Sequence, residues 1–370
     1  MQQRVIISQD IEHDLAQAIA ETEHDRVFVL TDDITQECCL PKVAVLFAKH
    51  NATTITIRHD DTNKTLATLA DVWTALQRSG ATRHSLLVNL GGGMVTDLGG
   101  FAAATFKRGI NFINIPTTLL AMVDAAVGGK TGINFGGLKN EVGAFANARY
   151  VIVNTCFLDT LDTANLCSGY AEMLKHSLIS NAQMWAEHVN FDILQPDLAE
   201  LQRMVAASIA VKEHIVADDP HEHGIRKALN FGHTIGHALE EFSMQQQWGA
   251  VVSAQLLPLA RARTAPKNTL LHGYAVAFGL IGELYISARK VGFPTARLHQ
   301  TAHFIRENYG AVAFTCDDYP TLLNLMRHDK KNTSDTINFT LLHDIGDIRI
   351  NQTATDEEIR EALDFIREGY

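Results

Sequence analysis

Hydrophobic and polar positions follow two different patterns along the chain, and the change comes near residue 160. Before that point, short runs rich in Val, Ile, Leu, Phe and Thr alternate with stretches that carry apolar residues at helical spacing. The expected strands are Arg26–Thr31, Thr54–Arg58, Ser85–Leu90, Asn111–Ile115 and Tyr150–Asn154, and the expected helices are Thr65–Ser79 and Val95–Phe106. Such alternation predicts a mostly parallel sheet with helices on both faces.

After residue 160, helical periodicity dominates. The expected helices are Asn165–Ser180, Asp197–Val216, Lys227–Phe242, His272–Val291, Thr295–Glu307 and Pro320–Arg327. A strand pair, Ile337–His343 and Asp347–Ile350, precedes a last helix that opens with a capping box of Thr355 and Glu358. The stretch 242–271 contains a Gln run and two prolines, which indicates an irregular insertion.

These patterns predict two domains. Residues 1–160 are expected to form an α/β, Rossmann-like nucleotide-binding domain. Residues 161–370 are expected to form a mainly α-helical domain for metal and substrate. A chain of 370 residues also suits two domains better than one core.

Composition limits the classes of partner. The chain is 46% hydrophobic and 20% charged, as in soluble globular proteins, and no apolar run reaches transmembrane length or resembles a signal peptide. The five cysteines form no CxxC pair, which favours buried free thiols in the cytoplasm over a structural disulfide. The net charge of −11 argues against nucleic acid and anionic membranes as partners.

Basic residues nevertheless gather near the motifs described below. They are Arg108, Lys130, Lys139, Lys175, Lys212, Arg226, Lys330 and Lys331. Two interpretations stay open at this point: a basic cleft for a small anionic substrate, or solvated side chains scattered over an acidic surface.

A glycine-rich turn follows the expected strand Ser85–Leu90. The run Gly91-Gly92-Gly93 leads into a helix that carries Asp97, and such a turn lets backbone N–H groups approach a pyrophosphate. The spacing is not GxGxxG, so an ordinary tight turn remains an alternative. Asp32 and Pro116-Thr117-Thr118 follow two other strands, and their polar groups favour a nucleotide site.

A second glycine-rich run, Gly128-Gly129-Lys130-Thr131-Gly132, presents a lysine without Walker A spacing. It is typical either of a hairpin or of a loop whose lysine binds phosphate. Because Lys139-Asn140 follows closely, both interpretations can hold together.

Candidate metal ligands lie on three expected helices. Glu172, His233 and His272, with His237 as a fourth candidate, supply one carboxylate and two or three imidazoles, which is the ligand set of a catalytic zinc-type site. His233 and His237 are four residues apart and share a helix face, so helix spacing alone makes both of them ligands. A core position for a single helical histidine is the alternative. Since no Glu follows His233, the HExxH metalloprotease motif is not met.

With these motifs in place, the chain resembles the 3-dehydroquinate synthase family of sugar-phosphate cyclases from about Val27 to Ile350. The motifs that carry the resemblance are Gly91-Gly92-Gly93 with Asp97, Phe106-Lys107-Arg108-Gly109, Pro116-Thr117-Thr118-Leu119-Leu120, Asp124, Gly128-Gly129-Lys130-Thr131-Gly132, Lys139-Asn140, Glu172-Met173-Leu174-Lys175, Arg226, Leu229-Asn230-Phe231-Gly232-His233, His237, His272-Gly273 and Asp329-Lys330-Lys331.

The resemblance implies a non-consumed NAD and a divalent metal, zinc or cobalt, held by Glu172, His233 and His272. It places His237 at the substrate instead of the metal. The residues implied to contact NAD are Asp32, Asp61, Lys64, Gly92, Gly93, Asp97, Thr117, Thr118, Lys130, Lys139 and Thr160.

The resemblance also implies a substrate site. Residues at or beside the substrate phosphate are Lys130, Asn140, His237, Lys330 and Lys331. Residues implied for the hydroxyls and carboxylate are Asp124, Lys175, Lys212, Arg226 and Asn230. Arg108 aligns with an arginine lent by a neighbouring subunit, which implies a homodimer.

The implied reaction converts 3-deoxy-D-arabino-heptulosonate 7-phosphate to 3-dehydroquinate and phosphate in the shikimate pathway. It proceeds by transient oxidation with NAD, elimination of phosphate, re-reduction, and ring opening followed by an intramolecular aldol closure. The alternatives are another sugar-phosphate cyclase, an NAD- and metal-dependent polyol dehydrogenase, or a non-catalytic scaffold. A dehydrogenase needs no groups that hold a phosphate and a carboxylate, and the residues that argue against it are Lys130, Asn140, Lys212, Arg226 and Lys330. Arg226 with Asn230 favours the synthase over cyclases whose substrates lack the carboxylate, and the full set of expected ligands argues against the scaffold.

Three features depart from the family pattern. Tyr274 stands where a Glu usually follows His-Gly, and Leu138 replaces a common Gly before Lys139. The stretch 242–271 lengthens the interval between His233 and His272. Tyr274 is expected to alter the residues behind the metal ligands, and an insertion that displaced the His272 helix would disrupt the metal site.

Overall fold

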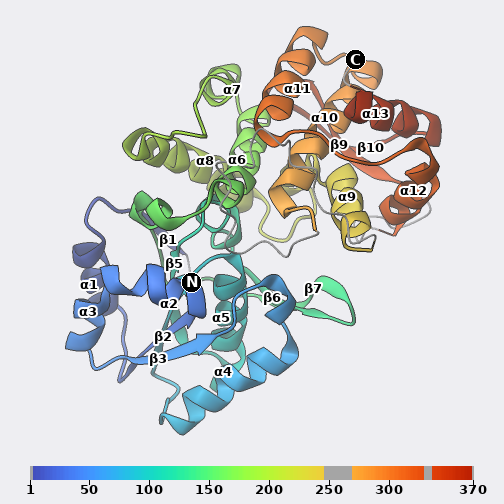
Figure 1. Ribbon diagram of the computed structural model, residues 1–370. Helices are drawn as coiled ribbons and strands as arrows, with labels where there is room; N and C mark the ends of the chain where they lie inside the picture. The colour runs from blue at the N-terminus through green and yellow to red at the C-terminus, as the bar shows by residue number, and fades with distance from the viewer. Residues whose placement is uncertain (1–2, 246–268, 329–335, 369–370) are drawn as a thin grey trace. The chain divides into compact units, whose positions relative to one another are not determined.

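The computed structural model describes residues 3–245, 269–328 and 336–368 (Figure 1). The chain divides into two compact units, one of Met1–Leu161 with Asp197–Ile209 and one of Asp162–Pro196 with Ala210–Tyr370. The functional assignment of domains to residues 1–160 and 161–370 stays a prediction. Most of the expected insertion, residues 246–268, lies outside the described residues.

The first unit is built on a six-stranded sheet in which every strand pair is parallel. Its strands, in spatial order, are β1 (Arg4–Ile7), β8 (Tyr150–Val153), β5 (Asn111–Pro116), β4 (Leu86–Gly91), β2 (Val27–Asp32) and β3 (Thr53–Ile57). Strands β2 and β4 are buried at every position. A strand covered on both faces is a continuous apolar run, which is the pattern that the sequence carries there.

Helices accompany this sheet along the chain (Figure 1). They are α1 (Ile11–Glu21), α2 (Asp33–Cys38), α3 (Ala44–Lys49), α4 (Leu66–Arg78) and α5 (Gly93–Thr105), with short helical turns η1 (Leu40–Lys42), η2 (Asp61–Asn63), η3 (Phe106–Arg108), η4 (Ala121–Ala125) and η5 (Thr155–Thr160). The α/β class expected for the N-terminal part is confirmed. The hydrophobic pattern did not predict β1 or the helices α1, α2 and α3.

A two-stranded hairpin of β6 (Lys130–Phe135) and β7 (Leu138–Phe145) belongs to the first unit. A hairpin is present, but its turn is not at Gly128–Gly132. The pairing of Phe135 with Leu138 shows that Gly136-Gly137 form the turn. Both glycines have positive φ, +61° and +84°, as a two-residue hairpin turn of the I′ type requires. Lys130 therefore begins a strand and does not occupy the turn.

The second unit is mainly helical, as expected. Its helices are α6 (Thr163–Leu178), α7 (Ala182–Val189), α8 (Leu198–Asp218, whose first half belongs to the first unit), η6 (Ile225–Asn230), α9 (His233–Gln245), α10 (His272–Lys290), α11 (Thr295–Tyr309), η7 (Cys316–Asp318), α12 (Tyr319–Arg327) and α13 (Asp356–Glu368), and its antiparallel strand pair is β9 (Asn338–Asp344) and β10 (Asp347–Thr353).

The predicted capping box at the start of α13 is confirmed. The Thr355 N–H donates to Glu358 Oε2 at 2.8 Å, and the Glu358 N–H donates to Thr355 Oγ1 at 3.2 Å.

The expected helix Lys227–Phe242 is wrong as a continuous element. The turn η6 ends at Asn230, and α9 begins at His233 after Gly232, whose φ is +81°. A β-carbon on Gly232 would lie 2.7 Å from Leu280 Cδ2, so this position needs glycine for both its backbone angle and its packing. The break makes His233 the first residue of α9.

Helix α10 is the core of the second unit and is buried along most of its length. It contacts α6 and α9 at glycines. A β-carbon on Gly273 would lie 1.8 Å from the carbonyl oxygen of Ser168, and one on Gly279 would lie 1.9 Å from that of Gly232. The backbones of α6, α9 and α10 therefore approach closely where their candidate ligands lie. None of the described helices combines the length and apolar character needed to cross a membrane.

Candidate metal and nucleotide sites

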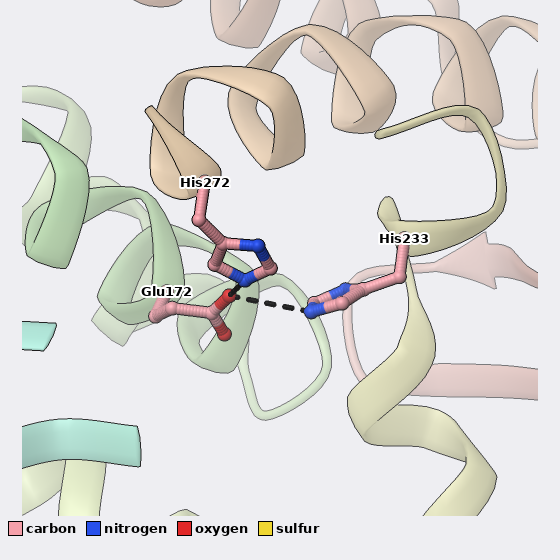
Figure 2. A group of neighbouring side chains, drawn as sticks. All are labelled: Glu172, His233 and His272. Carbon is pink, nitrogen blue, oxygen red and sulfur yellow. Dashed lines mark ion pairs between the residues drawn. The ribbon is translucent and has the colours of Figure 1, made fainter. Parts of the chain in front are cut away.

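Three candidate ligands from three helices of the second unit meet at one point (Figure 2). Glu172 comes from α6, His233 from the start of α9, and His272 from the start of α10. One ligand atom from each of the three residues lies within 4.8 Å of the others. The Nε2 atoms of His233 and His272 lie 3.3 and 3.4 Å from Glu172 Oε1.

The outer nitrogen of each imidazole is held by an acceptor. His233 Nδ1 donates to the carbonyl oxygen of Phe231 at 3.1 Å, and His272 Nδ1 donates to Glu240 Oε2 at 3.0 Å. With the proton fixed on Nδ1, each ring turns Nε2 toward Glu172. This is the arrangement in which protein imidazoles bind a metal, because the second nitrogen is anchored outside the coordination sphere.

Glu172 brings a negative charge to this point. The carboxylate is fully buried and pairs through Oε2 with Lys175, one turn later on α6. Burial raises the pKa of Glu172, but the charges of Lys175 and His233 outweigh burial and hold that pKa well below its ordinary value. Its buried Oε1 faces the two imidazole Nε2 atoms at 3.3 and 3.4 Å and makes no hydrogen bond of good geometry with a described residue. Such an oxygen is costly to bury unless a cation faces it.

The same charges act on His272. Burial lowers the pKa of this imidazole, but Glu240 and Glu172 together raise it to about 10. The cluster therefore favours a positive charge between its carboxylates, which either a proton or a divalent cation supplies. Carboxylate and imidazole ligands with a buried, incompletely satisfied oxygen fit a zinc- or cobalt-type ion.

His237 lies beside this cluster, one turn after His233. Its ring centroid is 5.2 Å from that of His233 and 5.9 Å from that of His272. The group of Glu172, His233 and His272 does not include His237, in contrast to the expectation from helix spacing alone. The placement of His237 at the substrate stays a prediction.

The other basic candidates of the second unit are largely buried. Lys212 lies on α8, and Arg226 lies in η6, where its Nη1 donates to the carbonyl oxygen of Pro220 at 2.6 Å. Asn230, at the end of η6, donates through Nδ2 to Glu222 Oε1 at 2.7 Å. Arg226 and Asn230 thus lie in the turn that precedes α9, the helix that carries the candidate ligand His233. Lys330 and Lys331 lie outside the described residues.

Sequence reasoning missed two acidic residues of the second unit. Glu240 anchors His272, and Glu283 on α10 accepts backbone hydrogen bonds from Gly232, Thr234 and Ile235 at 2.7, 2.9 and 3.2 Å. Glu283 thus caps the start of α9 from another helix. The sequence did contain a signal for Glu283, because it is a single acidic residue within the apolar run of α10.

The nucleotide candidates of the first unit lie where parallel strands end. Strands β2, β4 and β5 finish at Asp32, Gly91 and Pro116. Gly92 is the N-cap of α5 and Gly93 is its first residue, so free N–H groups lie at this edge. The N–H of Thr117 donates to the carbonyl oxygen of Gly91 at 3.0 Å and joins two of the strand ends. Nucleotides bind at such carboxyl edges of open parallel sheets.

Two polar candidates at this edge also cap short helical turns. Asp32 Oδ1 accepts the N–H of Thr35 at 2.7 Å at the start of α2, and burial raises the pKa of Asp32. Thr118 Oγ1 accepts the N–H of Ala121 at 3.2 Å. Their side chains are therefore held in place without a nucleotide.

Five further candidates, on three segments of the first unit, form one polar cluster. Lys64 Nζ donates to Asp97 Oδ2 at 2.5 Å and also to Asn140 Oδ1, and Lys139 Nζ lies 3.5 Å from Asp61 Oδ2. Burial raises the pKa of Asp97 and the charge of Lys64 opposes this.

A residue that sequence reasoning missed, Asn134 on β6, joins these segments. Asn134 Nδ2 donates to the carbonyl oxygen and to Oδ2 of Asp61 at 3.0 and 3.2 Å, and its Oδ1 accepts the N–H of Asn140 at 2.9 Å. The hairpin is thereby fastened to the segment Asp61–Lys64. Asn140 is held at a positive φ of +50°.

Four candidates of the first unit lie on other segments. Lys130 starts β6, Thr160 ends η5, and Asp124 lies in η4, near enough to Asp97 for its charge to raise the pKa of that carboxyl. Arg108 is exposed, with a φ of +70°. A positive φ in a residue other than glycine costs about 1–3 kcal/mol, so the surrounding structure holds Arg108 in a strained conformation.

Solved structures with the same fold include two cyclases. 2-Epi-5-epi-valiolone synthase from Streptomyces hygroscopicus subsp. jinggangensis, with NAD+ and Zn2+ bound, has a TM-score of 0.82 at 24% identity, covering 100% of this chain and 98% of its own. 2-Deoxy-scyllo-inosose synthase complexed with carbaglucose-6-phosphate, NAD+ and Co2+ has a TM-score of 0.81 at 23% identity, covering 100% and 96%. Glycerol dehydrogenase from Schizosaccharomyces pombe is more distant, with a TM-score of 0.63 at 13% identity, covering 99% and 88%.

Sequence comparison is more specific. The family model for the N-terminal part of 3-dehydroquinate synthase matches residues 54–168, and the model for its C-terminal part matches residues 169–332. The 3-dehydroquinate synthase of Parabacteroides distasonis is 50% identical over 100% of this chain and 99% of its own. That of Clostridium tetani is 32% identical over 92% and 86%. The chain belongs to the 3-dehydroquinate synthase family of enzymes.

Proposed function

We propose that the protein is an NAD- and metal-dependent 3-dehydroquinate synthase, which converts 3-deoxy-D-arabino-heptulosonate 7-phosphate to 3-dehydroquinate and phosphate in the shikimate pathway. Family membership over the whole chain supports the reaction. The convergence of Glu172, His233 and His272 is the observation that carries the metal-dependent chemistry.

The proposed metal ligands are Glu172, His233 and His272. Their buried oxygen and two anchored imidazoles fit zinc or cobalt, the ions present in the two solved cyclases. A bound divalent ion would act as a Lewis acid toward a substrate oxygen. The role of the protein is to hold the three ligands in place before the ion arrives, through Phe231 and Glu240 behind the two rings.

The proposed NAD site uses the carboxyl edge of the parallel sheet, with Asp32, Gly92, Gly93, Asp97, Thr117 and Thr118, and the cluster of Asp61, Lys64 and Lys139, together with Lys130 and Thr160. NAD would supply a hydride acceptor that is restored within each turnover. The N-terminus of α5 is suited to a pyrophosphate because its N–H groups and its helix dipole favour an anion.

The substrate carries a phosphate and a carboxylate, and the protein offers cations for both. We assign Arg226 with Asn230 to the carboxylate, because a guanidinium binds that group in a bidentate manner. Lys175, Lys212 and Asp124 are assigned to the hydroxyls and the reacting end. Lys130, Asn140, His237, Lys330 and Lys331 are assigned to the phosphate. Together these groups orient a flexible anion before reaction.

Two finer assignments complete the proposal. The protein would act as a homodimer in which Arg108 reaches the neighbouring site, and the exposed, strained backbone at Arg108 supports a functional position for this residue. It would work in the cytoplasm, in keeping with its five free cysteines, Cys38, Cys39, Cys156, Cys167 and Cys316.

Product identification tests this function. Metal-loaded protein is incubated with NAD and 3-deoxy-D-arabino-heptulosonate 7-phosphate, and in parallel with glucose 6-phosphate, a sugar phosphate that lacks the carboxylate. We expect 3-dehydroquinate by mass spectrometry from the first substrate and no cyclised product from the second. Turnover of glucose 6-phosphate alone would instead assign the protein to the cyclases whose sugar-phosphate substrates lack a carboxylate.

A further inference from the structure

The residue two positions after His272 does not contribute to the metal cluster. Tyr274, which stands where the family pattern usually has Glu, is buried and packs its ring edge-on against Tyr309, with centroids 5.0 Å apart. Its hydroxyl also makes a hydrogen bond with Cys167. Position 274 therefore supplies no carboxylate to the neighbourhood of the metal ligands, so the anchor of His272 must come from elsewhere.

Glu240 on α9 provides this anchor. Its Oε2 accepts the hydrogen bond from His272 Nδ1 at 3.0 Å, and the carboxylate is nearly buried. The same part of α9 holds the chain just before α10, because Ser243 Oγ accepts the N–H of Leu270 at 3.1 Å. Ser243 in turn donates to the carbonyl oxygen of Glu240 at 2.7 Å. The start of α10 is thus fastened to α9 by one hydrogen bond between two side chains and by one between a side chain and the backbone.

We propose that Glu240 is a positioning residue for the metal: it fixes the tautomer and ring orientation of His272 so that Nε2 faces Glu172, independently of residue 274. The inference rests on the proposed metal-dependent function. A neutral imidazole carries its proton on either nitrogen, and its ring can turn about the bond to Cβ. With a carboxylate behind Nδ1 and a metal at Nε2, only one tautomer and one orientation satisfy both nitrogens. Without it, part of the population presents an N–H where the metal needs a lone pair.

A purely structural role for Glu240 makes a different prediction. If Glu240 only joined α9 to α10, replacing it would lower the thermal stability of the apoprotein and leave metal binding unchanged in the folded fraction. If it positions His272, replacement changes the affinity for the ion and the ligand field that the ion experiences. Replacement of a residue behind a metal-bound imidazole typically weakens metal binding about 10–100-fold.

The test uses the apoprotein at one fixed pH, titrated with Co2+ and followed by its visible absorption and by competition with a chelator. Glu240→Leu removes the acceptor, whereas Glu240→Gln keeps an acceptor oxygen and removes only the charge. Glu241→Gln is the matched control, because Glu241 is exposed on the same helix and accepts a hydrogen bond from Gln245 Nε2 at 3.2 Å. Tyr274→Phe tests the position that departs from the family pattern.

We expect Co2+ binding about 10–100-fold weaker in Glu240→Leu, with an altered visible spectrum, a smaller loss in Glu240→Gln, and wild-type behaviour in the other two variants. Wild-type affinity and spectrum in the folded Glu240 variants would overturn the inference, as would a tenfold loss in Tyr274→Phe. If Glu240→Leu does not fold, Glu240→Gln decides alone. Failure of the wild-type protein to bind Co2+ or Zn2+ would contradict the proposed function itself, so the two failures are distinguishable.

Discussion

The Glu283 carboxylate on α10 accepts a 2.9 Å hydrogen bond from the backbone N–H of Thr234, in the first turn of α9. The N–H groups of Gly232 and Ile235 donate to the same carboxylate. A helix start leaves its first N–H groups without partners inside the helix, and here a buried acid from a neighbouring helix satisfies three of them. Because α9 begins with one proposed metal ligand, His233, this contact helps to fix the position of His233 relative to α10, which begins with another, His272.

Replacing Glu283 is therefore expected to destabilise the second unit. In Glu283→Gln, an NH2 group replaces one of the two carboxylate oxygens. At least one backbone N–H at the start of α9 then faces a donor and loses its acceptor, at a cost of about 1–3 kcal/mol. Scanning calorimetry of Glu283→Gln should show a lower melting temperature, and titration calorimetry should show weaker Co2+ binding. Glu357→Gln, at an exposed position, serves as control and should change stability by less than about 0.5 kcal/mol. An unchanged melting temperature in Glu283→Gln would contradict this account of the cap.

The crossing of α9 and α10 depends on Gly279. A β-carbon there would meet the carbonyl oxygen of Gly232 at 1.9 Å, so Gly279→Ala forces two backbones apart. Gly282→Ala, about one turn later on the same helix, meets side-chain carbons of Ile235 and Ile366, and these side chains can move. We expect Gly279→Ala to lose metal affinity and soluble yield and Gly282→Ala to lose much less. Equal behaviour of the two variants would show that the close crossing is not needed.

The sequence predicts those parts of the fold and of the candidate site that depend on residues close together in the chain. Strands β2 and β4 were predicted because buried parallel strands are continuous apolar runs, and the ends of such strands located Asp32 and Thr117. Residue type and helix spacing gave four metal candidates, Glu172, His233, His237 and His272, and the family resemblance reduced them to the three without His237.

Features that depend on tertiary contacts could not be predicted in this way. The helical pattern runs straight through Gly232, and the break there depends on Glu283 and Leu280, which approach from α10. The hairpin was expected at Gly128–Gly132, whereas the pairing of β6 with β7 places its turn at Gly136-Gly137. Glu240 and Asn134 act through contacts with segments that are distant in the sequence. The residues next to them in the sequence therefore do not predict these contacts.

The buried pair of Lys64 and Asp97 predicts a pH-dependent effect. Burial raises the pKa of Asp97 and Lys64 opposes this, so Lys64→Met should raise that pKa further. A carboxyl whose pKa is higher in the folded state than in the unfolded state favours folding at low pH, and this contribution is lost as the pH rises through the folded pKa. Lys64→Met should therefore be destabilised more at pH 7.5 than at pH 5.

Urea denaturation of Lys64→Met at the two pH values measures this difference. The double variant Lys64→Met with Asp97→Asn is the control, because it has no titrating carboxyl at this position. An equal loss of stability of the single variant at both pH values would contradict a buried charged pair.

Asn134 is expected to support binding of NAD without contacting it. Asn134→Ala removes the contacts that hold Asp61 and Asn140 together, so the hairpin and the nearby lysines become less ordered. We expect affinity for NAD, measured by calorimetry, to fall about tenfold, which corresponds to about 1.4 kcal/mol. Asn190→Ala, at an exposed position on the second unit, is the control. Unchanged affinity in Asn134→Ala would show that the hairpin needs no such anchor.

Metal removal should abolish turnover reversibly. Dialysis against a chelator is expected to reduce activity to background, and addition of Zn2+ or Co2+ should restore it. Glu172→Gln should resist restoration, because it removes the negative charge that faces both Nε2 atoms. Full activity of the metal-free protein would rule out a role of this cluster in the reaction.

The most direct test of the synthase assignment follows inorganic phosphate and NADH absorbance together in one reaction with 3-deoxy-D-arabino-heptulosonate 7-phosphate and a trace of NAD. A synthase restores NAD in each turnover. We therefore predict phosphate release far in excess of the NAD present, with no net NADH. NADH that accumulates without release of phosphate would contradict the assignment and indicate a dehydrogenase.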